Sequence, residues 1–468
     1  MFHGIRARRL ATQVKHFRSR FVLDGHAEWS AVLPAELLKQ LLLASHERWR
    51  ERVYGPLHTL TLFVNQVLSA DGSCQDAVAR NLSERTAQGL APCSLNSAAY
   101  CRARRRLSVD LLGRLVRTLG ERLQRTQPQP WLWRGRSLVL ADGTTVSMPD
   151  TPANRSRFAQ SPEQRPGLGF PLARIVALVS LSTGAVLDWA CGPCKGEQTS
   201  ETALMWHLAG QLKSGDVLIA DRLYASYFLL ARLRQLGVDV VMRQHHRRRT
   251  DFRRGRRLGK GDHVVLWQRP QRPPWMSHTE YALMPETLAV RETRHQGWIT
   301  VTSLLDAREL DRAELLSLYQ SRWQIELDLR SIKCVMQMDV LRCRSPEMID
   351  KEIAAHLCAY NLVRTVMAQA GALGGCLPRK LSFAAALQIL RAFEQTLRHA
   401  PGKRGLVVRA CVLGAIAQAR LPTRPDRLEP RAKKRRPKKA AFLTVPRDQA
   451  RAELRRSQDE LRGKYALS

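Results

Sequence analysis

The chain has 468 residues, of which 44% are hydrophobic, and it carries a formal net charge of +35. This hydrophobic fraction excludes a wholly disordered protein, and the length is sufficient for two to four domains. The positive charge excludes an ordinary metabolic enzyme and indicates a polyanionic partner, with nucleic acid favoured over an anionic membrane. Because no apolar run approaches the roughly 20 residues that cross a bilayer, no membrane association is expected.

Residues 1–130 are predicted to be mainly helical and to bind DNA. Apolar residues recur at helical spacing between residues 57 and 72, and Ser108 is placed to cap a later helix. The short helix before Ser108 is crowded with arginines: Arg102, Arg104, Arg105 and Arg106. Such a basic helix suits docking to a DNA groove or backbone, although a solvated charged face has the same pattern.

From residue 136 the pattern changes to short strands and helices. The predicted order is a hairpin about an Asp-Gly turn (137–148), a strand pair (174–190), a helix (200–213), a strand (216–221), a helix (226–237) and a strand (238–243). This order indicates an α/β fold, in which helices cover the faces of a mixed sheet.

The ten cysteines are scattered along the chain, which indicates reduced thiols. Cys191 and Cys194 have C-x-x-C spacing. A thioredoxin-type pair should open a helix, and a zinc site needs a second pair, so neither role is predicted.

A β-rich insertion is predicted for residues 244–300, after which the chain becomes helical again. One helix is expected to begin at Asp311, its N-cap, and to reach Lys333. Further helices are predicted at 350–371, 382–399 and 405–419. The Pro-punctuated basic run 424–442 is expected to stay disordered until it meets phosphate.

Two aspartates lie where predicted strands end. Asp142 follows the apolar run 138–141, and Asp221 follows 217–220. Functional side chains gather at the carboxyl ends of strands in open α/β sheets. Each residue also has a simpler explanation, because Asp142 precedes Gly143 and suits a turn, whereas Asp221 suits a helix cap.

A third acid, Glu326, lies on a cation-rich face of the helix that reaches Lys333. At about 100° per residue, five side chains fall within an arc of roughly 80°: Tyr319, Arg322, Glu326, Arg330 and Lys333. Charge pairs four residues apart are also typical of a surface helix with weak ion pairs. Together with the two aspartates, however, the pattern predicts a site for two Mg²⁺ or Mn²⁺ ions beside cations that hold DNA phosphates.

These residues resemble a known family. The spacing Y-x2-R-x3-E-x6-K, at Tyr319, Arg322, Glu326 and Lys333, is similar to the signature of the DDE transposases of the insertion-sequence-four family. The segments LADGTTVSMPDTPAN and GDVLIADRLYASY resemble the two aspartate blocks of that family, and AAYCRARRRL resembles its N-terminal region. The resemblance extends from about residue 60 to residue 370.

The resemblance implies a ribonuclease-H-like catalytic domain that is interrupted by the β-rich insertion. Asp142, Asp221 and Glu326 would form the catalytic triad and hold the two metal ions. Together with the sequence pattern, this predicts a helical DNA-binding region (1–130), the catalytic domain (136–243 and 301–345), the insertion (244–300), a helical C-terminal region (346–420) and a basic tail (421–468).

The resemblance also implies how the transposon end is held. Tyr319, Arg322 and Lys333 would grip the DNA near the cut. Trp298, in the insertion, would stack a flipped base, although a buried strand aromatic would look the same in sequence. Arg330 lies outside the signature, so a phosphate contact is predicted for it from helical phase alone.

The function expected from these features is metal-dependent DNA cleavage at element ends, followed by strand transfer into target DNA. The expected partners are terminal inverted repeats, target DNA and, by analogy, a second copy of the chain on paired ends. The expected location is the bacterial cytoplasm, at the nucleoid. Two alternatives are a non-catalytic DNA-binding protein derived from a transposase and a structure-specific nuclease on the same scaffold.

Overall fold

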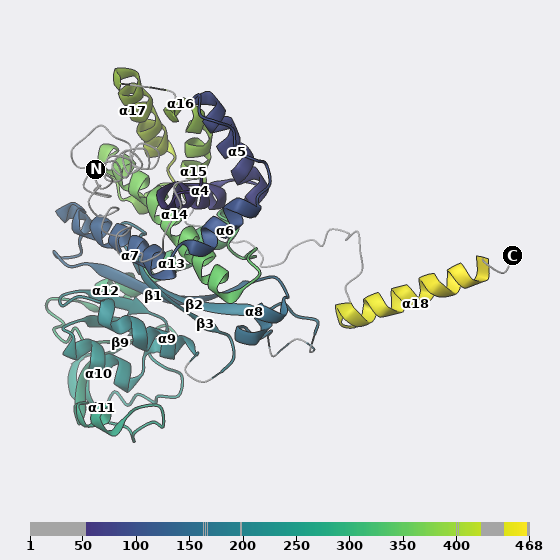
Figure 1. Ribbon diagram of the computed structural model, residues 1–468. Helices are drawn as coiled ribbons and strands as arrows, with labels where there is room; N and C mark the ends of the chain where they lie inside the picture. The colour runs from purple at the N-terminus through teal and green to yellow at the C-terminus, as the bar shows by residue number, and fades with distance from the viewer. Residues whose placement is uncertain are drawn as a thin grey trace, which may run out of the picture.

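The computed structural model describes residues 53–422 and 444–465, apart from residues 162, 164, 166, 197, 198, 399 and 401. A central sheet lies among helices, and the C-terminal helix α18 (Arg447–Tyr465) extends away from this body (Figure 1). No helix in the described part of the chain is long and apolar enough to cross a membrane.

One nine-stranded sheet has the strand order β3-β2-β1-β4-β5-β9-β8-β7-β6. Its strands are β1 (Leu138–Ser147), β2 (Leu172–Ser180), β3 (Val186–Pro193), β4 (Val217–Ala220), β5 (Asp239–Arg243), β6 (Arg256–Gly259), β7 (Asp262–Gln268), β8 (Thr287–His295) and β9 (Trp298–Thr302). β1, β4 and β5 are parallel neighbours, and β2 and β3 continue the sheet as antiparallel strands on the other side of β1. This half of the sheet confirms the expected mixed, ribonuclease-H-like arrangement.

The first strand differs from its prediction. β1 is continuous through Asp142 and Gly143, so that no turn divides it into a hairpin. β2 pairs with it along most of its length and places Ala177 opposite Asp142. The predicted Asp-Gly turn is therefore wrong, because this long antiparallel ladder keeps the backbone extended.

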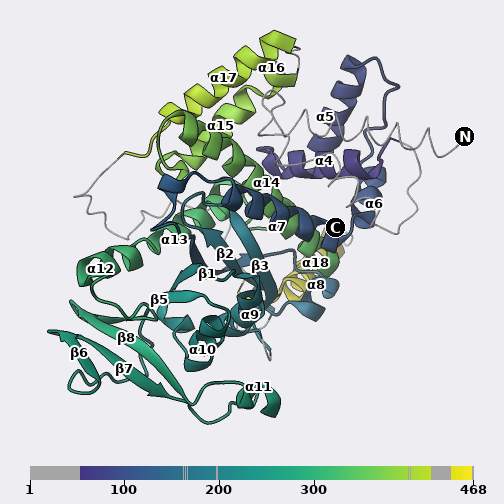
Figure 2. The same cartoon turned by 90° about the vertical axis from the view of Figure 1, so that its left-hand side faces the viewer.

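Helices cover both faces of the sheet at β1 to β5 (Figure 2). Residues of β1, β2, β4 and β5 divide between two hydrophobic cores, one on each face. The helices are α7 (Val109–Arg125), α13 (Trp323–Arg330) and α14 (Pro346–Leu373) on one face, with α9 (Glu201–Leu208) and α10 (Tyr227–Gln235) on the other. Leu140 packs in the core formed with α7, α13 and α14, whereas Val139 and Ala141 pack in the core formed with α9 and α10. Because strand side chains alternate in direction, this phase also decides which face each later side chain of β1 meets.

Helix α7 packs against the central sheet and against α14. Gly120 approaches β3 so closely that a Cβ on it would lie 2.2 Å from the carbonyl oxygen of Val186. Asn361, on the buried helix α14, accepts from the backbone N–H of Val186 at 2.8 Å and donates to the carbonyl of Val116 at 3.1 Å. These contacts join α7, β3 and α14.

Three helices precede α7 in the described chain: α4 (Pro56–Leu68), α5 (Cys74–Ala87) and α6 (Ala98–Arg106). The predicted cap of α7 is confirmed, since the Ser108 hydroxyl accepts a hydrogen bond from the backbone N–H of Leu111. Helix α5 lies in the region predicted to be mainly helical, but its bounds are not indicated by the sequence, because it buries few of its residues and has no continuous apolar face. Residues 1–52 of the predicted DNA-binding region lie outside the described residues.

The predicted insertion is β-rich, as expected, and it extends the main sheet. β5 pairs with β9, and β8, β7 and β6 follow in antiparallel order. A short helix, α11 (His278–Ala282), joins β7 to β8. Inside the insertion, Arg291 forms a buried ion pair with Asp262 at 2.6 Å.

The predicted helix from Asp311 to Lys333 has three parts. Asp311 caps α12 (Arg312–Gln320) by accepting from the backbone N–H of Glu314 at 2.8 Å, as predicted. A turn separates α12 from α13, and a π-helical segment η4 (Ser331–Val335) follows. The prediction of one regular helix from Asp311 to Lys333 is therefore wrong. Because η4 is π-helical, Lys333 is not placed at the rotation of about 100° per residue that was used to predict its direction.

The remaining helices are α8 (Pro152–Arg157), α15 (Phe383–Ala392), α16 (Glu394–Arg398) and α17 (Gly402–Gln418). Helices α14 to α17 confirm the predicted helical C-terminal segment. The basic run 424–442 lies outside the described residues. Helix α18 lies within the predicted basic tail, after the run for which disorder is expected.

Candidate active site

Asp142 and Asp221 occupy equivalent positions on the parallel neighbours β1 and β4. Ala141 and Ala220 lie opposite each other in the ladder, and each directly precedes one of the aspartates. The residues two positions before the aspartates both pack in the core formed with α7, α13 and α14. Because side chains alternate along a strand, both aspartates point toward the layer that contains α13.

Asp142 is partly buried and has two hydrogen-bond donors. Its Oδ1 accepts from the backbone N–H of Gly143 at 2.8 Å, and its Oδ2 accepts from Nη1 of Arg322 at 3.2 Å. Burial raises the pKa of Asp142 to about 6 despite these donors, and the charges of Glu201 and Asp221 add to the rise. A cation bound here would favour the ionised carboxylate.

Asp221 has a carboxylate that no protein group of the described residues binds. It precedes the short 3₁₀ helix η3 (Arg222–Tyr224), but its side chain makes no capping hydrogen bond. Within the described parts of the chain, no hydrogen bond or ion pair engages this carboxylate. The helix-cap explanation of Asp221 is therefore wrong, and its oxygens are available to a ligand.

Glu326 is linked to Asp142 through one arginine. It lies in the first turn of α13, where its Oε1 accepts from Nη2 of Arg322 at 2.8 Å. The other terminal nitrogen of Arg322 donates to Asp142. The sequence predicts a DNA contact for Arg322, whereas the structure shows its guanidinium as a bridge between two of the three acids.

The three acids offer carboxylate oxygens, the ligands that Mg²⁺ and Mn²⁺ prefer. As they stand, no three acidic, histidine or cysteine side chains of the described residues are close enough to hold one ion. The Arg322 guanidinium lies between Asp142 and Glu326 and supplies positive charge there. The residues therefore fit a divalent cation in ligand type and in charge.

A fourth carboxylate, that of Glu201, lies against the backbone of Gly143, and the sequence does not identify it. A Cβ on Gly143 would lie 2.5 Å from Cδ of Glu201. Nε of Arg174 lies 4.0 Å from Oε1 of Glu201, and the Tyr224 hydroxyl donates to Oε2 of Glu201 at 3.5 Å. The glycine after Asp142 was the only local signal, because it leaves the space that this carboxylate fills.

Another missed residue, Asp328, anchors the helix that carries Glu326. It is fully buried, and its Oδ1 accepts from Arg364 at 2.5 Å and from the Tyr360 hydroxyl at 3.0 Å. Its Oδ2 accepts from Arg379 at 2.5 Å. Arg379 also donates to backbone carbonyls at the end of β2, so this network ties α13 to the sheet.

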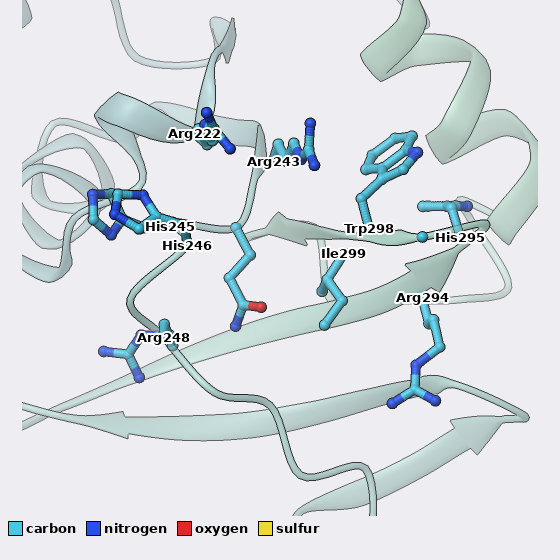
Figure 3. A pocket seen from close by; sticks show the side chains of 11 residues that line it. Arg222, Arg243, His245, His246, Arg248, Arg294, His295, Trp298 and Ile299 are labelled. Atoms are coloured by element: carbon cyan, nitrogen blue, oxygen red, sulfur yellow. The ribbon is translucent and has the colours of Figure 1, made fainter.

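Trp298 lines a basic pocket of about 360 Å³ at the start of β9 (Figure 3). The basic side chains of the pocket are Arg222, Arg243, Arg248, Arg294, His245, His246 and His295. Arg222 directly follows Asp221, which places the pocket next to the acids. The Trp298 ring is partly exposed and lies 4.9 Å from the ring of Tyr319, so the explanation of Trp298 as a buried strand aromatic is wrong.

Arg330 and Lys333 remain open to solvent near the acids. Arg330 is exposed at the end of α13, and Lys333 is partly exposed in η4. Across the ranges that the structure describes, neither side chain forms an ion pair or hydrogen bond with protein. Their DNA contacts stay predictions.

The arginines of α6 divide into two groups. Three are exposed or partly exposed: Arg102, Arg105 and Arg106. Arg104 is only 7% exposed, and its guanidinium lies over the rings of Phe63 at 4.9 Å and Tyr100 at 5.2 Å. The predicted DNA contact of Arg104 is therefore wrong, because its charged group belongs to the core of the N-terminal helices.

Comparisons with known proteins identify the family of this chain. A family model described as "Transposase DDE domain" matches residues 133–362. The transposase InsG for insertion sequence element IS4, from Escherichia coli strain K12, is 31% identical over 360 residues, which cover 75% of this chain and 78% of InsG. The transposase for insertion sequence element IS421 of Escherichia coli is 28% identical over 100 residues, 19% of this chain and 27% of that protein.

A solved structure of the piggyBac transposase synaptic complex with hairpin DNA is 12% identical, with a TM-score of 0.41, and covers 89% of this chain and 88% of its own. The family match contains all three candidate acids, and the InsG match extends well beyond it. Enzymes of this family act on DNA and generally use divalent metal ions. The chain therefore belongs to the DDE transposases of the IS4 family.

Proposed function

We propose that this transposase cuts DNA at the ends of its element in a metal-dependent reaction and joins the freed 3′ ends to target DNA. One observation carries the proposal. Asp142 within β1 and Asp221 at the end of β4 follow residues that lie opposite each other on adjacent parallel strands, and both point toward the helix that bears Glu326. Rigid elements of this kind hold reacting groups more accurately than loops do.

Asp142, Asp221 and Glu326 would hold two Mg²⁺ or Mn²⁺ ions, which would activate a water or a 3′-hydroxyl and stabilise the leaving oxygen. Arg322 has a part in both states. Without metal it neutralises Asp142 and Glu326. Once displaced, its guanidinium is free to donate two parallel hydrogen bonds to a phosphate of the transposon end.

Tyr319, Arg330 and Lys333 would hold the DNA backbone beside the cut. The last two have charged groups without protein partners among the described residues, which leaves them available to phosphate. Trp298 would stack a flipped base, which contributes about 1–3 kcal/mol of binding free energy. The positive charge that lines its pocket would stabilise the phosphates on either side of that base.

Arg102, Arg105 and Arg106 would contact the terminal inverted repeats, and the basic run 424–442 would add contacts that do not depend on sequence. Two copies of the chain would bind paired element ends, because both ends must reach the target together. The proposed location is the bacterial cytoplasm, at the nucleoid. We propose the same domain boundaries as those predicted from the sequence. Helix α7 belongs to the DNA-binding region by these boundaries, and it packs on the proposed catalytic domain.

The test is cleavage of DNA that carries an element end, in Mg²⁺, by the wild type and by Asp142→Asn, Asp221→Asn and Glu326→Gln. Each variant should cut at least about 10³-fold more slowly and still bind the DNA, because only the metal ligands change. Asp306→Asn, an exposed acid before α12, is the matched control and should cut normally.

Undiminished cutting by the three variants would refute the assignment of the acids. A wild type that binds ends without ever cutting them would indicate a non-catalytic DNA-binding protein. Equal cutting of branched DNA without any element end would indicate a structure-specific nuclease.

A further inference from the structure

Arg104 is a buried cation that has no acidic partner in the described structure. Its guanidinium donates to Gln66 Oε1 at 3.2 Å, to the sulfur of Cys74 at 3.1 Å and to that of Cys101 at 3.9 Å. Leaving a buried charge uncompensated costs several kcal/mol. The two sulfurs that it contacts are therefore the groups placed to supply the negative charge.

Cys74 begins α5 and Cys101 lies in α6, and both are partly exposed and free. The two sulfurs contact the same nitrogen of Arg104, Nη2, and are thereby held next to each other. The hydrogen bond from Cys74 lowers the pKa of Cys101 to about 5, Arg104 adds to this effect, and burial opposes it. The pair thus combines a thiolate with a neighbouring thiol, the two species that disulfide chemistry needs.

We propose that Cys74 and Cys101 are a redox-active dithiol, which peroxides oxidise to a disulfide between α5 and α6. The Cys101 thiolate attacks one oxygen of hydrogen peroxide, the O–O bond breaks, and hydroxide leaves and takes up a proton as water. Cys101 is then a sulfenic acid. The Cys74 sulfur attacks the Cys101 sulfur, the S–O bond breaks, and the hydroxyl group leaves as water with the Cys74 proton. Two electrons pass from the two sulfurs to the peroxide.

Oxidation changes the charge balance of the N-terminal helices. It removes the thiolate that faces Arg104 and joins α5 covalently to α6, the helix that carries Arg102 and Arg105. The modification would therefore act on the segment proposed to bind element ends. It does not depend on the assignment of the catalytic acids.

The C-x-x-C pair is a natural control within the same chain. Burial raises the pKa of Cys191 to about 12 and also raises the pKa of Cys194. No hydrogen bond from an arginine reaches either sulfur in the described residues. Although its spacing resembles a redox motif, this pair remains protonated and should react slowly.

The test uses the full, reduced chain at pH 7, exposed to hydrogen peroxide, quenched with an alkylating agent and digested for peptide mass spectrometry. The peptides of Cys74 and Cys101 should become linked at least about tenfold faster than those of Cys191 and Cys194, after allowing for the weaker nucleophilicity of a low-pKa thiolate. Linkage at an equal or slower rate, or no linkage, would overturn the proposal. This comparison needs no substitution and so does not depend on the folding of a variant.

Two variants assign the roles within the pair. With Cys74→Ser, the sulfenic acid should persist on Cys101, where dimedone traps it, and a trapped group found elsewhere instead would contradict the proposal. Arg104→Gln should slow the linkage severalfold, whereas Arg114→Gln, which removes a guanidinium that pairs with Asp110, should not. Equal rates in these two arginine variants would show that Arg104 does not activate the thiols.

Discussion

Glu326 and Asp328 lie two residues apart on α13 and face different surroundings. Glu326 has one partner, Arg322, and its side chain is 35% exposed. Asp328 is fully buried and accepts hydrogen bonds from Arg364, Arg379 and a tyrosine. The helix therefore carries one carboxylate with a single, shared cation and one whose charge is more than balanced.

This difference separates a carboxylate that can exchange its partner from one that cannot. Arg322 is shared by two acids, so a metal ion can replace it without leaving a buried charge alone. Removing Asp328 from its network would leave two buried guanidinium groups without a counter-charge, which is costly. We infer that Asp328 fixes the position of α13 and that Glu326 is free to bind a ligand.

The strongest test of this contrast is Asp328→Asn. The amide keeps the shape of the side chain but removes the charge that Arg364 and Arg379 share, so the free energy of unfolding should fall by about 3–5 kcal/mol. Urea unfolding followed by circular dichroism measures the change. Glu326→Gln is the matched variant and should lower the free energy of unfolding by less than about 1 kcal/mol, because its pair is partly exposed. Equal losses in both variants would contradict the division of roles.

A second prediction concerns the space around the acids. In Gly143→Ala, the new methyl group would meet the carboxylate of Glu201 at 2.5 Å, which would displace Glu201 or bend β1 at Asp142. Because small errors in the position of a catalytic group are costly, cleavage should slow by about 10–100-fold while the protein stays folded. Adding Glu201→Ala should restore part of the lost rate. A double variant that cuts no faster than Gly143→Ala would show that the clash is not the cause.

Local sequence patterns predicted the candidate acids, but they did not indicate the contacts that each acid makes with residues distant in the sequence. The apolar runs before Asp142 and Asp221 correctly indicated a strand in front of each aspartate, but the pairing of β1 with β4 was not predictable from them. β1 continues past Asp142 because its pairing with β2 outweighs the turn preference of Asp-Gly. The partners of Asp328 lie 32 to 51 positions away, so no local pattern indicates that it is buried.

The arginines of α6 also show that a sequence pattern does not reveal which charged side chain is buried. Arg102, Arg104 and Arg105 are alike in sequence, and only the packing of Phe63 and Tyr100 decides that Arg104 turns inward. A pattern of charges cannot distinguish such an arginine from its exposed neighbours until the aromatic partners are known.

A smaller effect is expected when Lys333, which is partly exposed in η4 directly after α13, is replaced. Replacing it with Gln should weaken binding to DNA with an element end and reduce the slope of log affinity against log salt by about one ion, because one phosphate contact is lost. Lys213→Gln is the matched control, since Lys213 lies 3.6 Å from Glu121 at the surface, and its slope should not change. An unchanged slope in the Lys333 variant would show that this residue does not touch phosphate.

The smallest expected effect is a pH dependence of stability from α14, the helix that supplies Arg364. Burial lowers the pKa of His356, although Glu352 opposes the shift, and Nδ1 of this neutral ring donates to the carbonyl of Glu352 at 2.9 Å. The unfolded chain has a histidine pKa of about 6.5, so below that pH it binds a proton that the folded chain does not. Stability should therefore fall as the pH decreases from about 6.5. Urea unfolding between pH 7.5 and 5 measures the free energy of unfolding. Its decrease with falling pH should be less steep in His356→Gln, by a slope that corresponds to at most one proton. His207→Gln, which replaces an exposed histidine, should keep the wild-type dependence. The same pH dependence in both variants would mean that His356 takes up its proton without unfolding.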